Sequence, residues 1–279
     1  MKASQRRIVQ ERTIVLAVRA PGYKLPFVIY SGFIVELSGN WVWFTSAHGR
    51  KQISQTFEEW PRTTVEFLNF VEGGHRIPLP RSEIQFVDFQ DIHQEKLLEL
   101  GDLSQKDQRD IKNLDIAFTF ISMTTRLNLG NGLGKAFTLN DMSDDLSMYS
   151  SDETHDLACY VVGVPASSYY PPSDPGSALI NIYPLHPEPN DVVSRETLRV
   201  EDFFVWMPAY WIQDDGDNDL TGVSGGPALL VINDTDVLLI GMEVSQIISS
   251  RVKLVGICPI ESVAKSIAFH LKEHDLTII

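Results

Sequence analysis

The residues best placed to do chemistry lie at 220–230 (LTGVSGGPALL), where a serine stands among glycines and a proline leads into an apolar segment. Gly222, Gly225 and Gly226 allow backbone angles that other residues avoid, and they have no side chains to block another molecule. Such a loop can present the Ser224 hydroxyl and direct backbone N–H groups to one point, as an oxyanion hole requires. The pattern therefore predicts acyl-transfer chemistry at Ser224.

Residues 222–227 (GVSGGP) resemble the G-x-S-G-G-P nucleophile motif of the trypsin/chymotrypsin-like serine proteases. Residues 43–49 (WFTSAHG) are similar to that family's apolar strand ending in Thr-Ala-Ala-His, with Ser46 in place of the first alanine. Residues 113–118 (NLDIAF) look like its Asn-Asp-Ile-Ala-Leu segment. The three motifs follow the family's chain order of histidine, aspartate and serine, and together they span most of the chain.

The resemblance implies a role for each motif residue. Ser224 would be the nucleophile, and His48 would be the base that accepts its proton. Asp115 would hold the other imidazole N–H and stabilise the imidazolium. The backbone N–H groups of Gly222 and Ser224 would bind the oxyanion.

Two departures from the family motifs bear on how the activity would be regulated. Val223 stands where zymogen-activated members have an aspartate that pairs with a newly cut N-terminus, so we expect no activation by such cleavage. Gly49 stands where the secreted members have a disulfide-bonded cysteine. In lacking this disulfide the chain is closer to the Deg-type bacterial proteases, in which a regulatory protein partner or an assembly can supply the control.

Candidate substrate contacts are Asn218, six residues before the serine, and Val244 and Ser245, in a segment along which a substrate backbone could pair. Asn218 lies in the acidic run 214–219 (DDGDND), which would favour a basic substrate side chain through charge complementarity. A solvated loop explains the same acidity equally well. The spacing of the acidic residues at 214–219 does not match that of a calcium-binding loop.

The composition limits the class of partner. The chain has 279 residues, 43% of them hydrophobic, enough for one large or two small packed domains. A formal net charge of −14 disfavours binding to nucleic acid. We expect no cofactor and no metal; His270 and His274 share a helix face but lack a third ligand.

The location expected from the sequence is cytoplasmic. Cys159 and Cys258 lie in apolar runs and are interpreted as buried small hydrophobes. The basic start of the chain is followed by Gln10, Glu11 and Arg12, which interrupt the apolar region of a signal peptide. No apolar run approaches the ~20 residues of a membrane span.

Short strand-like runs separated by turn residues predict an all-β fold, and the resemblance implies two six-stranded antiparallel barrels of the chymotrypsin type. Strands are expected at 13–20, 27–37, 40–46, 63–71, 84–89, 157–165, 236–243 and 253–259. A short charged helical insertion is expected at 91–112, an irregular proline-rich loop over 171–189 and an amphipathic helix after 260. The predicted domains are 1–135, carrying His48 and Asp115, and 136–279, carrying Ser224.

The sequence thus favours a trypsin-like serine endopeptidase acting on a protein or peptide substrate through an acyl-enzyme. Two alternatives stay open. One is a catalytically silent peptide-binding module on the same fold, and the other is an esterase-like hydrolase that uses the same triad.

Overall fold

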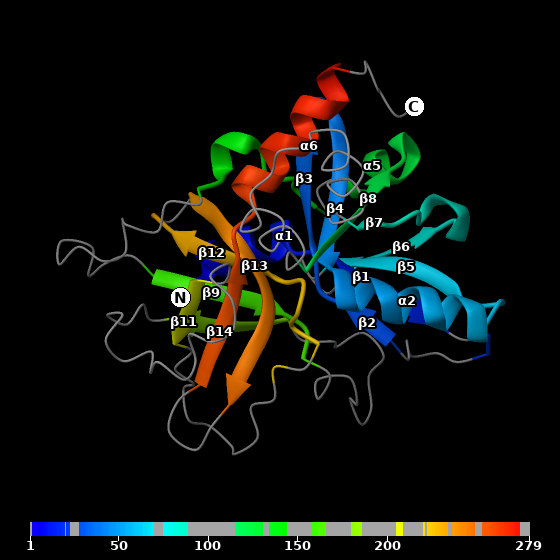
Figure 1. The fold of residues 1–279 in the computed structure, drawn as a ribbon, viewed down its shortest axis with the longest axis horizontal. Helices are drawn as coiled ribbons and strands as arrows, with labels where there is room; N and C mark the ends of the chain where they lie inside the picture. The colour runs from blue at the N-terminus through cyan, green and yellow to red at the C-terminus, as the bar shows by residue number, and fades with distance from the viewer. Residues whose placement is uncertain are drawn as a thin grey trace, which may run out of the picture.

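The computed structural model describes residues 2–19, 21–22, 28–69, 75–88, 115–130, 134–143, 158–165, 180–185, 205–208, 220, 222–233, 236–248 and 253–273. Within these ranges the strands form three antiparallel sheets. Figure 1 shows strands β1 to β8 on one side of the molecule and β9 to β14 on the other. The predicted helical insertion at 91–112 lies outside the described residues.

The first sheet has the strand order β2-β1-β5-β6. Its members are β1 (Val15–Arg19), β2 (Val28–Tyr30), β5 (Thr64–Asn69) and β6 (His75–Leu79). Strand β1 confirms the strand expected at 13–20. Pro78, between the strands expected at 63–71 and 84–89, lies within β6 opposite Glu66. As an edge strand, β6 tolerates a residue without an N–H.

The second sheet has the order β3-β4-β8-β7, and its strand β4 leads into the helix that contains His48. It is built from β3 (Phe33–Leu37), β4 (Asn40–Ser46), β7 (Val87–Asp88) and β8 (Ile116–Ile121). The β3–β4 pair confirms the predicted hairpin, whose turn places Ser38 and Gly39 at positive φ. The strand expected over 84–89 is reduced to β7, after the 3₁₀ turn η2 (Arg81–Glu83).

The third sheet has the order β10-β9-β12-β13-β14-β11. Its strands are β9 (Ala158–Gly163), β10 (Asn181–Leu185), β11 (Val205–Pro208), β12 (Pro227–Val231), β13 (Val237–Ile248) and β14 (Lys253–Cys258). Strand β10 corrects part of the predicted irregular loop, because Pro184 pairs with Tyr160 at the sheet's edge. Cys159 and Cys258 are buried in this sheet, as predicted.

Antiparallel β structure is therefore the basis of the fold, as expected, but none of the three sheets closes into a barrel among the described strands. In the first half the reason is local. The chain breaks its pairing at Ser31 and Gly32, between β2 and β3, so the strands on either side belong to different sheets. Six strands are found in the one sheet of the second half.

Helices cover the sheets and join the two halves. They are α1 (Ala3–Arg12), α2 (Ala47–Glu59), α5 (Met123–Gly130), the 3₁₀ turn η3 (Leu139–Asp141) and α6 (Glu261–Glu273). Helix α6 confirms the predicted closing helix and packs on β3 of the first half, where the Ser38 hydroxyl donates to the Ala268 carbonyl. No helix in the described ranges is long and apolar enough to cross a membrane.

One apolar core runs through both predicted domains. Side chains of β3, β4 and β8, among them Phe33, Phe44 and Phe118, belong to the same buried cluster as Leu239 and Met242 of β13. Ring contacts at centroid distances of 5.8 Å link Phe44 to both other aromatic residues. The two halves are therefore held together by apolar burial across the predicted boundary at 135.

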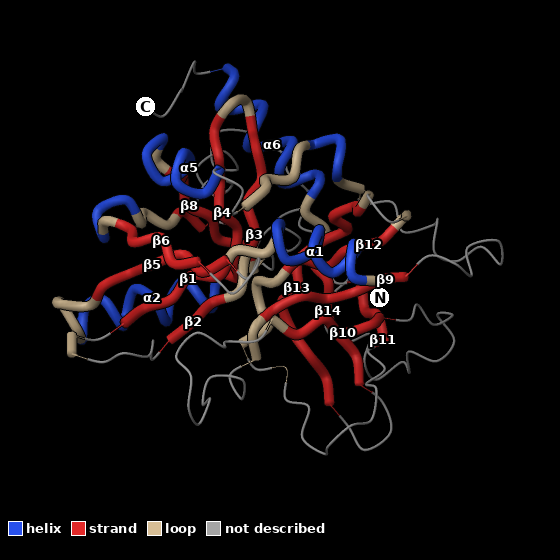
Figure 2. Tube along the Cα trace, turned by 180° about the vertical axis from the view of Figure 1, so that it is seen from behind, coloured by secondary structure: helices blue, strands red, loops and turns tan. Residues whose placement is uncertain are grey.

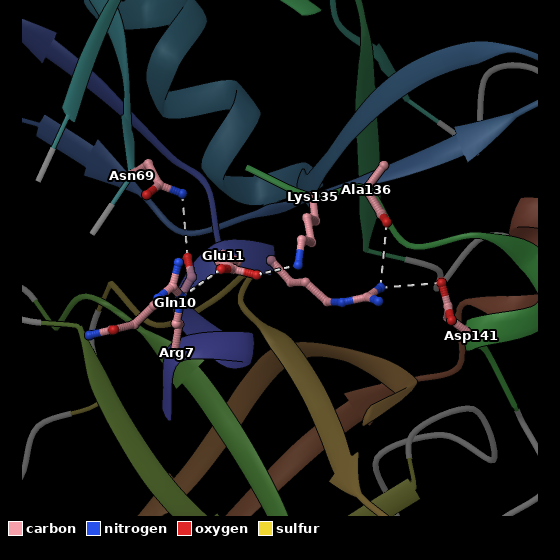
Figure 3. Close-up of polar contacts among 8 residues, drawn as sticks. Arg7, Gln10, Glu11, Asn69, Lys135, Ala136 and Asp141 are labelled. Atoms are coloured by element: carbon pink, nitrogen blue, oxygen red, sulfur yellow. Dashed lines mark hydrogen bonds and ion pairs between the residues drawn. The ribbon is translucent and has the colours of Figure 1, made fainter. Parts of the chain in front are cut away.

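Helix α1 lies between the strands of the two halves on the back of the molecule (Figure 2). Its Glu11 accepts from Arg7 at 3.0 Å and pairs with Lys135 at 2.7 Å, while Arg12 reaches Asp141 at 3.2 Å. Figure 3 shows these partners converging on the helix from the segment 134–141, which leads from one half to the other. The polar contacts thus fix α1 to the connection between the halves.

We expect Glu11→Gln to weaken this connection and change the acid stability of the protein. Burial raises the pKa of Glu11, but hydrogen bonds and charges from Lys135 and Arg7 outweigh burial and leave the pKa below its ordinary value. A lowered carboxyl pKa stabilises the fold above the unfolded-state pKa, and that stability is lost as the pH falls through the folded-state pKa. The substitution should lower Tm at pH 7 by about 4–8 °C, for a cost of about 2 kcal/mol, and reduce the acid decline of Tm.

Glu36→Gln is the matched control. Glu36 pairs with Arg126 at 3.5 Å, and both side chains are much more exposed than that of Glu11. Exposed pairs contribute about 0–1 kcal/mol, so its Tm should barely change. Equal losses of Tm in the two variants would contradict the role given to the α1 network.

Candidate active site

The histidine lies where a strand changes into a helix. Strand β4 ends at Ser46, whose hydroxyl accepts from the Gly49 N–H at 3.3 Å and so caps α2. Ser46 pairs with Ile116 of β8, which brings Asp115, just before β8, beside the first turn of α2. The sheet register therefore places His48 next to Asp115, although 67 residues separate them in the chain.

Asp115 holds His48 at two points. One carboxylate oxygen accepts from the backbone N–H of His48 at 2.9 Å, and the other hydrogen-bonds to Nδ1 of the imidazole. With Nδ1 bonded to a carboxylate, Nδ1 carries the proton and Nε2 is the acceptor. The His48 side chain is 46% exposed and that of Asp115 25%, so Nε2 belongs to a group that solvent can reach. This is the geometry expected of a general base with its orienting acid.

The serine loop is held by a dense set of backbone bonds. Val223 N–H donates to Leu220 O and Gly226 N–H donates to Val223 O, both at 2.8 Å. Gly225 N–H donates to Glu243 O of β13 at 2.7 Å, and Gly222 and Gly225 both have positive φ. No hydrogen bond between described residues uses the N–H of Gly222 or Ser224, the two predicted oxyanion donors. Their role stays a prediction.

The loop packs directly against the strand that leads to the histidine. A Cβ on Gly225 would lie 2.5 Å from both the Ser31 carbonyl oxygen and the Thr45 hydroxyl, and 3.0 Å from the Ser46 nitrogen. The Ser31 hydroxyl also donates to Gly222 O at 2.8 Å and accepts from Val164 N–H at 3.0 Å. The glycine at 225 is therefore required by close approach, and Ser31 joins the loop to both halves.

The Ser224 side chain lies close enough to the carboxyl group of Glu243 to lower its pKa. His48 Nε2 instead faces the Ser46 hydroxyl at 3.4 Å. Among the described residues no hydrogen bond joins His48 to Ser224. The structure thus brings the three predicted residues to one region and forms the His48–Asp115 link, but among the described residues it does not form the His48–Ser224 link.

Glu243 is a component of the site that the sequence interpretation missed. It lies on β13, is only 1% exposed, and its Oε2 has no hydrogen-bond partner among the described residues. Burial raises the pKa of Glu243 to about 8; the Ser224 hydrogen bond opposes this rise and the nearby charge of Asp115 adds to it. Burial therefore favours the neutral form of this carboxyl group. The available signal was one carboxylate within the apolar run 237–244 (VLLIGMEV).

The remaining predicted residues take other places. Val223 is fully buried against Gly163 in an apolar contact. Val244 is buried in the core shared by the two halves, and Ser245 is partly buried. Asn218 lies outside the described residues. In the part of the chain that the structure describes, no cluster of side chains suits a metal ion.

Gly225→Ala should destabilise the protein much more than Gly39→Ala. Both glycines have positive φ, +90° and +82°, so an alanine is strained by about 1–2 kcal/mol at either position. At Gly39 nothing lies within 4 Å of the new Cβ, whereas at Gly225 backbone atoms block it. For Gly225→Ala alone, overpacking should lower the free energy of unfolding by a further about 1–3 kcal/mol, as measured by urea unfolding. Equal losses of unfolding free energy in the two variants would show that the loop does not pack against β4 in this way.

Comparison with known proteins does not extend the assignment, since no protein-family model matches the chain and no curated protein is similar to it.

Proposed function

We propose that the protein is a serine hydrolase of the trypsin-like endopeptidase type, which cleaves peptide bonds through an acyl-enzyme formed on Ser224. One observation carries the proposal. The two-point hydrogen bonding of His48 by Asp115 lies beside a glycine-rich serine loop that packs on the same strand end. A core salt bridge would not need an imidazole that is 46% exposed.

In the proposed reaction Ser224 Oγ attacks the substrate carbonyl carbon while its proton passes to His48 Nε2. Asp115 keeps the imidazole in the required tautomer and stabilises the imidazolium. The N–H groups of Gly222 and Ser224 bind the oxyanion. The imidazolium then gives its proton to the leaving amine. In the second half of the reaction His48 takes a proton from the attacking water and returns it to Ser224 Oγ, which releases the acyl group.

This reaction requires the Ser224 hydroxyl to point toward His48 Nε2. Ser224 is partly exposed, and the packing of Gly225 keeps its backbone beside β4. Rotation about one side-chain bond is fast, on the order of picoseconds to nanoseconds for an exposed residue.

The finer architecture belongs to the same proposal. We infer two β-barrel domains, 1–135 and 136–279, with the site in the cleft between them. The distribution of the sheets supports this, because β1 to β8 precede the boundary and β9 to β14 follow it. His48 and Asp115 come from the first half, and Ser224 and Glu243 come from the second.

A silent peptide-binding module on the same fold is the second candidate. The observation in its favour is that no hydrogen bond among the described residues joins Ser224 to His48, whose Nε2 faces the Ser46 hydroxyl. Such a protein would hold a peptide in the cleft without turnover. An esterase with the same triad would differ only in its substrate.

A fluorophosphonate probe separates hydrolase from binding module. We expect the wild type to be labelled and Ser224→Ala to be unlabelled, since removing the nucleophile of a characterised serine protease costs on the order of 10⁶ in turnover. Ser46→Ala is the matched control, because Ser46 is the serine next to His48 Nε2 but is only 1% exposed. It should retain labelling and lose about 1 kcal/mol of stability through the lost helix cap.

Labelling that persists in Ser224→Ala and disappears in Ser46→Ala would assign the nucleophile to Ser46. A folded wild type that is not labelled would favour the binding module. Digestion of a peptide library by the active protein would then distinguish an endopeptidase from an esterase.

Asp115→Asn should leave the fold intact and lower turnover by about 10⁴, the loss measured for the equivalent change in a characterised protease. An amide cannot stabilise the imidazolium, and it favours the wrong tautomer. The measurement is kcat on a peptide or ester substrate, with Glu36→Gln as a surface control. A loss of less than about tenfold would contradict the role of Asp115.

A further inference from the structure

The Ser46 hydroxyl lies between the start of α2 and the imidazole of His48. Its oxygen accepts from the Gly49 N–H at 3.3 Å and lies 3.4 Å from His48 Nε2. Because Nδ1 carries the proton that faces Asp115, Nε2 is an acceptor, and the Ser46 hydroxyl donates to it. Ser46 is 1% exposed, so one accepted and one donated bond satisfy this hydroxyl without solvent.

Two departures from the family motif meet at this contact. Ser46 stands where the motif has its first alanine, and Gly49 stands where the secreted members have a cysteine. A Cβ on Gly49 would lie 2.9 Å from Ser46 Oγ and 3.2 Å from a ring carbon of Tyr30, which is too close for the hydroxyl to stay in place. The glycine therefore leaves the space that the serine hydroxyl occupies.

We propose that Ser46 is a positioning residue that holds His48 in a resting state, by occupying the Nε2 lone pair that has to accept the Ser224 proton. This inference rests on the proposed hydrolase function. It gives the site an internal restraint on its base, which is released when a substrate brings Ser224 and His48 together, and this control needs no cleaved N-terminus.

The contact suits the neutral imidazole and opposes the imidazolium. Nε2 has one lone pair, so a hydrogen bond from Ser46 excludes one from Ser224. Once Nε2 is protonated it becomes a donor, and the Ser46 hydroxyl would have to turn its own proton away from it. That proton would then be buried without an acceptor, which is costly. The Ser46 bond therefore has to break as His48 takes up a proton.

The resting contact can break without disturbing the rest of the site. Asp115 binds the backbone N–H and Nδ1 of His48, and neither bond involves Ser46. The Ser46 contact is long at 3.4 Å, and the imidazole is exposed on its other side. A group that arrives at Nε2 can thus replace Ser46 while Asp115 keeps the imidazole oriented.

The first test measures the rate of fluorophosphonate labelling of Ser224 in Ser46→Ala at neutral pH. We expect labelling to be about two- to tenfold faster than in the wild type, the equivalent of one neutral hydrogen bond. Ser46→Thr keeps both the hydroxyl and the helix cap, and its rate should return to about the wild-type value. Labelling of Ser46→Ala at the wild-type rate or more slowly would overturn the inference.

Ser122→Ala is the matched control for the lost helix cap. Ser122 follows β8, and its hydroxyl accepts from the N–H three residues later, that of Thr125, at 3.2 Å. It lies at the other end of the β4–β8 pair, since Trp41 pairs with Ile121 and Ser46 with Ile116. Its labelling rate should equal that of the wild type. An equal acceleration in Ser122→Ala would assign the effect to lost stability and overturn the role of Ser46.

The second test does not need an active nucleophile. Diethyl pyrocarbonate acylates a neutral imidazole nitrogen through its lone pair, and peptide mapping by mass spectrometry gives the rate at His48. In the Ser224→Ala background, Ser46→Ala should raise this rate by a similar factor, whereas Ser122→Ala should not change it. Equal rates with Ser46 and with Ser46→Ala would overturn the contact whatever the labelling shows. Faster acylation without fluorophosphonate labelling of any folded variant would instead overturn the hydrolase function, and the resting state with it.

Discussion

The close packing of Gly225 against the end of β4 is the contact on which the rest of the site depends. Without a side chain, the loop at 222–226 fits against Ser31, Thr45 and Ser46 and is hydrogen-bonded to β13 on its other side. It thus lies between strands of both halves. Any increase in that separation would move Ser224 away from His48, however well each half were folded.

The pairing of the halves depends in turn on apolar burial and on α1. The shared cluster joins the aromatic side chains of β3, β4 and β8 to β13 and α6. The polar contacts of Glu11 and Arg12 then fix the connecting segment at 134–141. Apolar burial provides most of the association free energy, while the ion pairs set its geometry because they are directional.

Electrostatics at the site follow from two carboxyl groups of unlike surroundings. Asp115 is partly exposed and hydrogen-bonded to His48, so its charge is compensated. Glu243 is buried, and burial raises the pKa of its carboxyl group. The surroundings of the two acids therefore differ through burial.

Local patterns of the sequence were sufficient for the elements with strong periodicity and clear turns: β1, the β3–β4 hairpin, β9 and the helix α6. They also predicted His48, Asp115 and Ser224 as one group, of which the structure joins His48 to Asp115 by hydrogen bonds. They failed where context outweighs propensity, as at Pro78 and Pro184, which edge strands accommodate, and at the predicted barrels, since pairing between distant strands has no local signal. The sequence by itself therefore determined which side chains can do chemistry. Only the tertiary structure decided that Glu243 is buried beside the serine loop, because its burial and its backbone hydrogen bonds to Gly225 and Gly226 arise when β13 and the loop pack together.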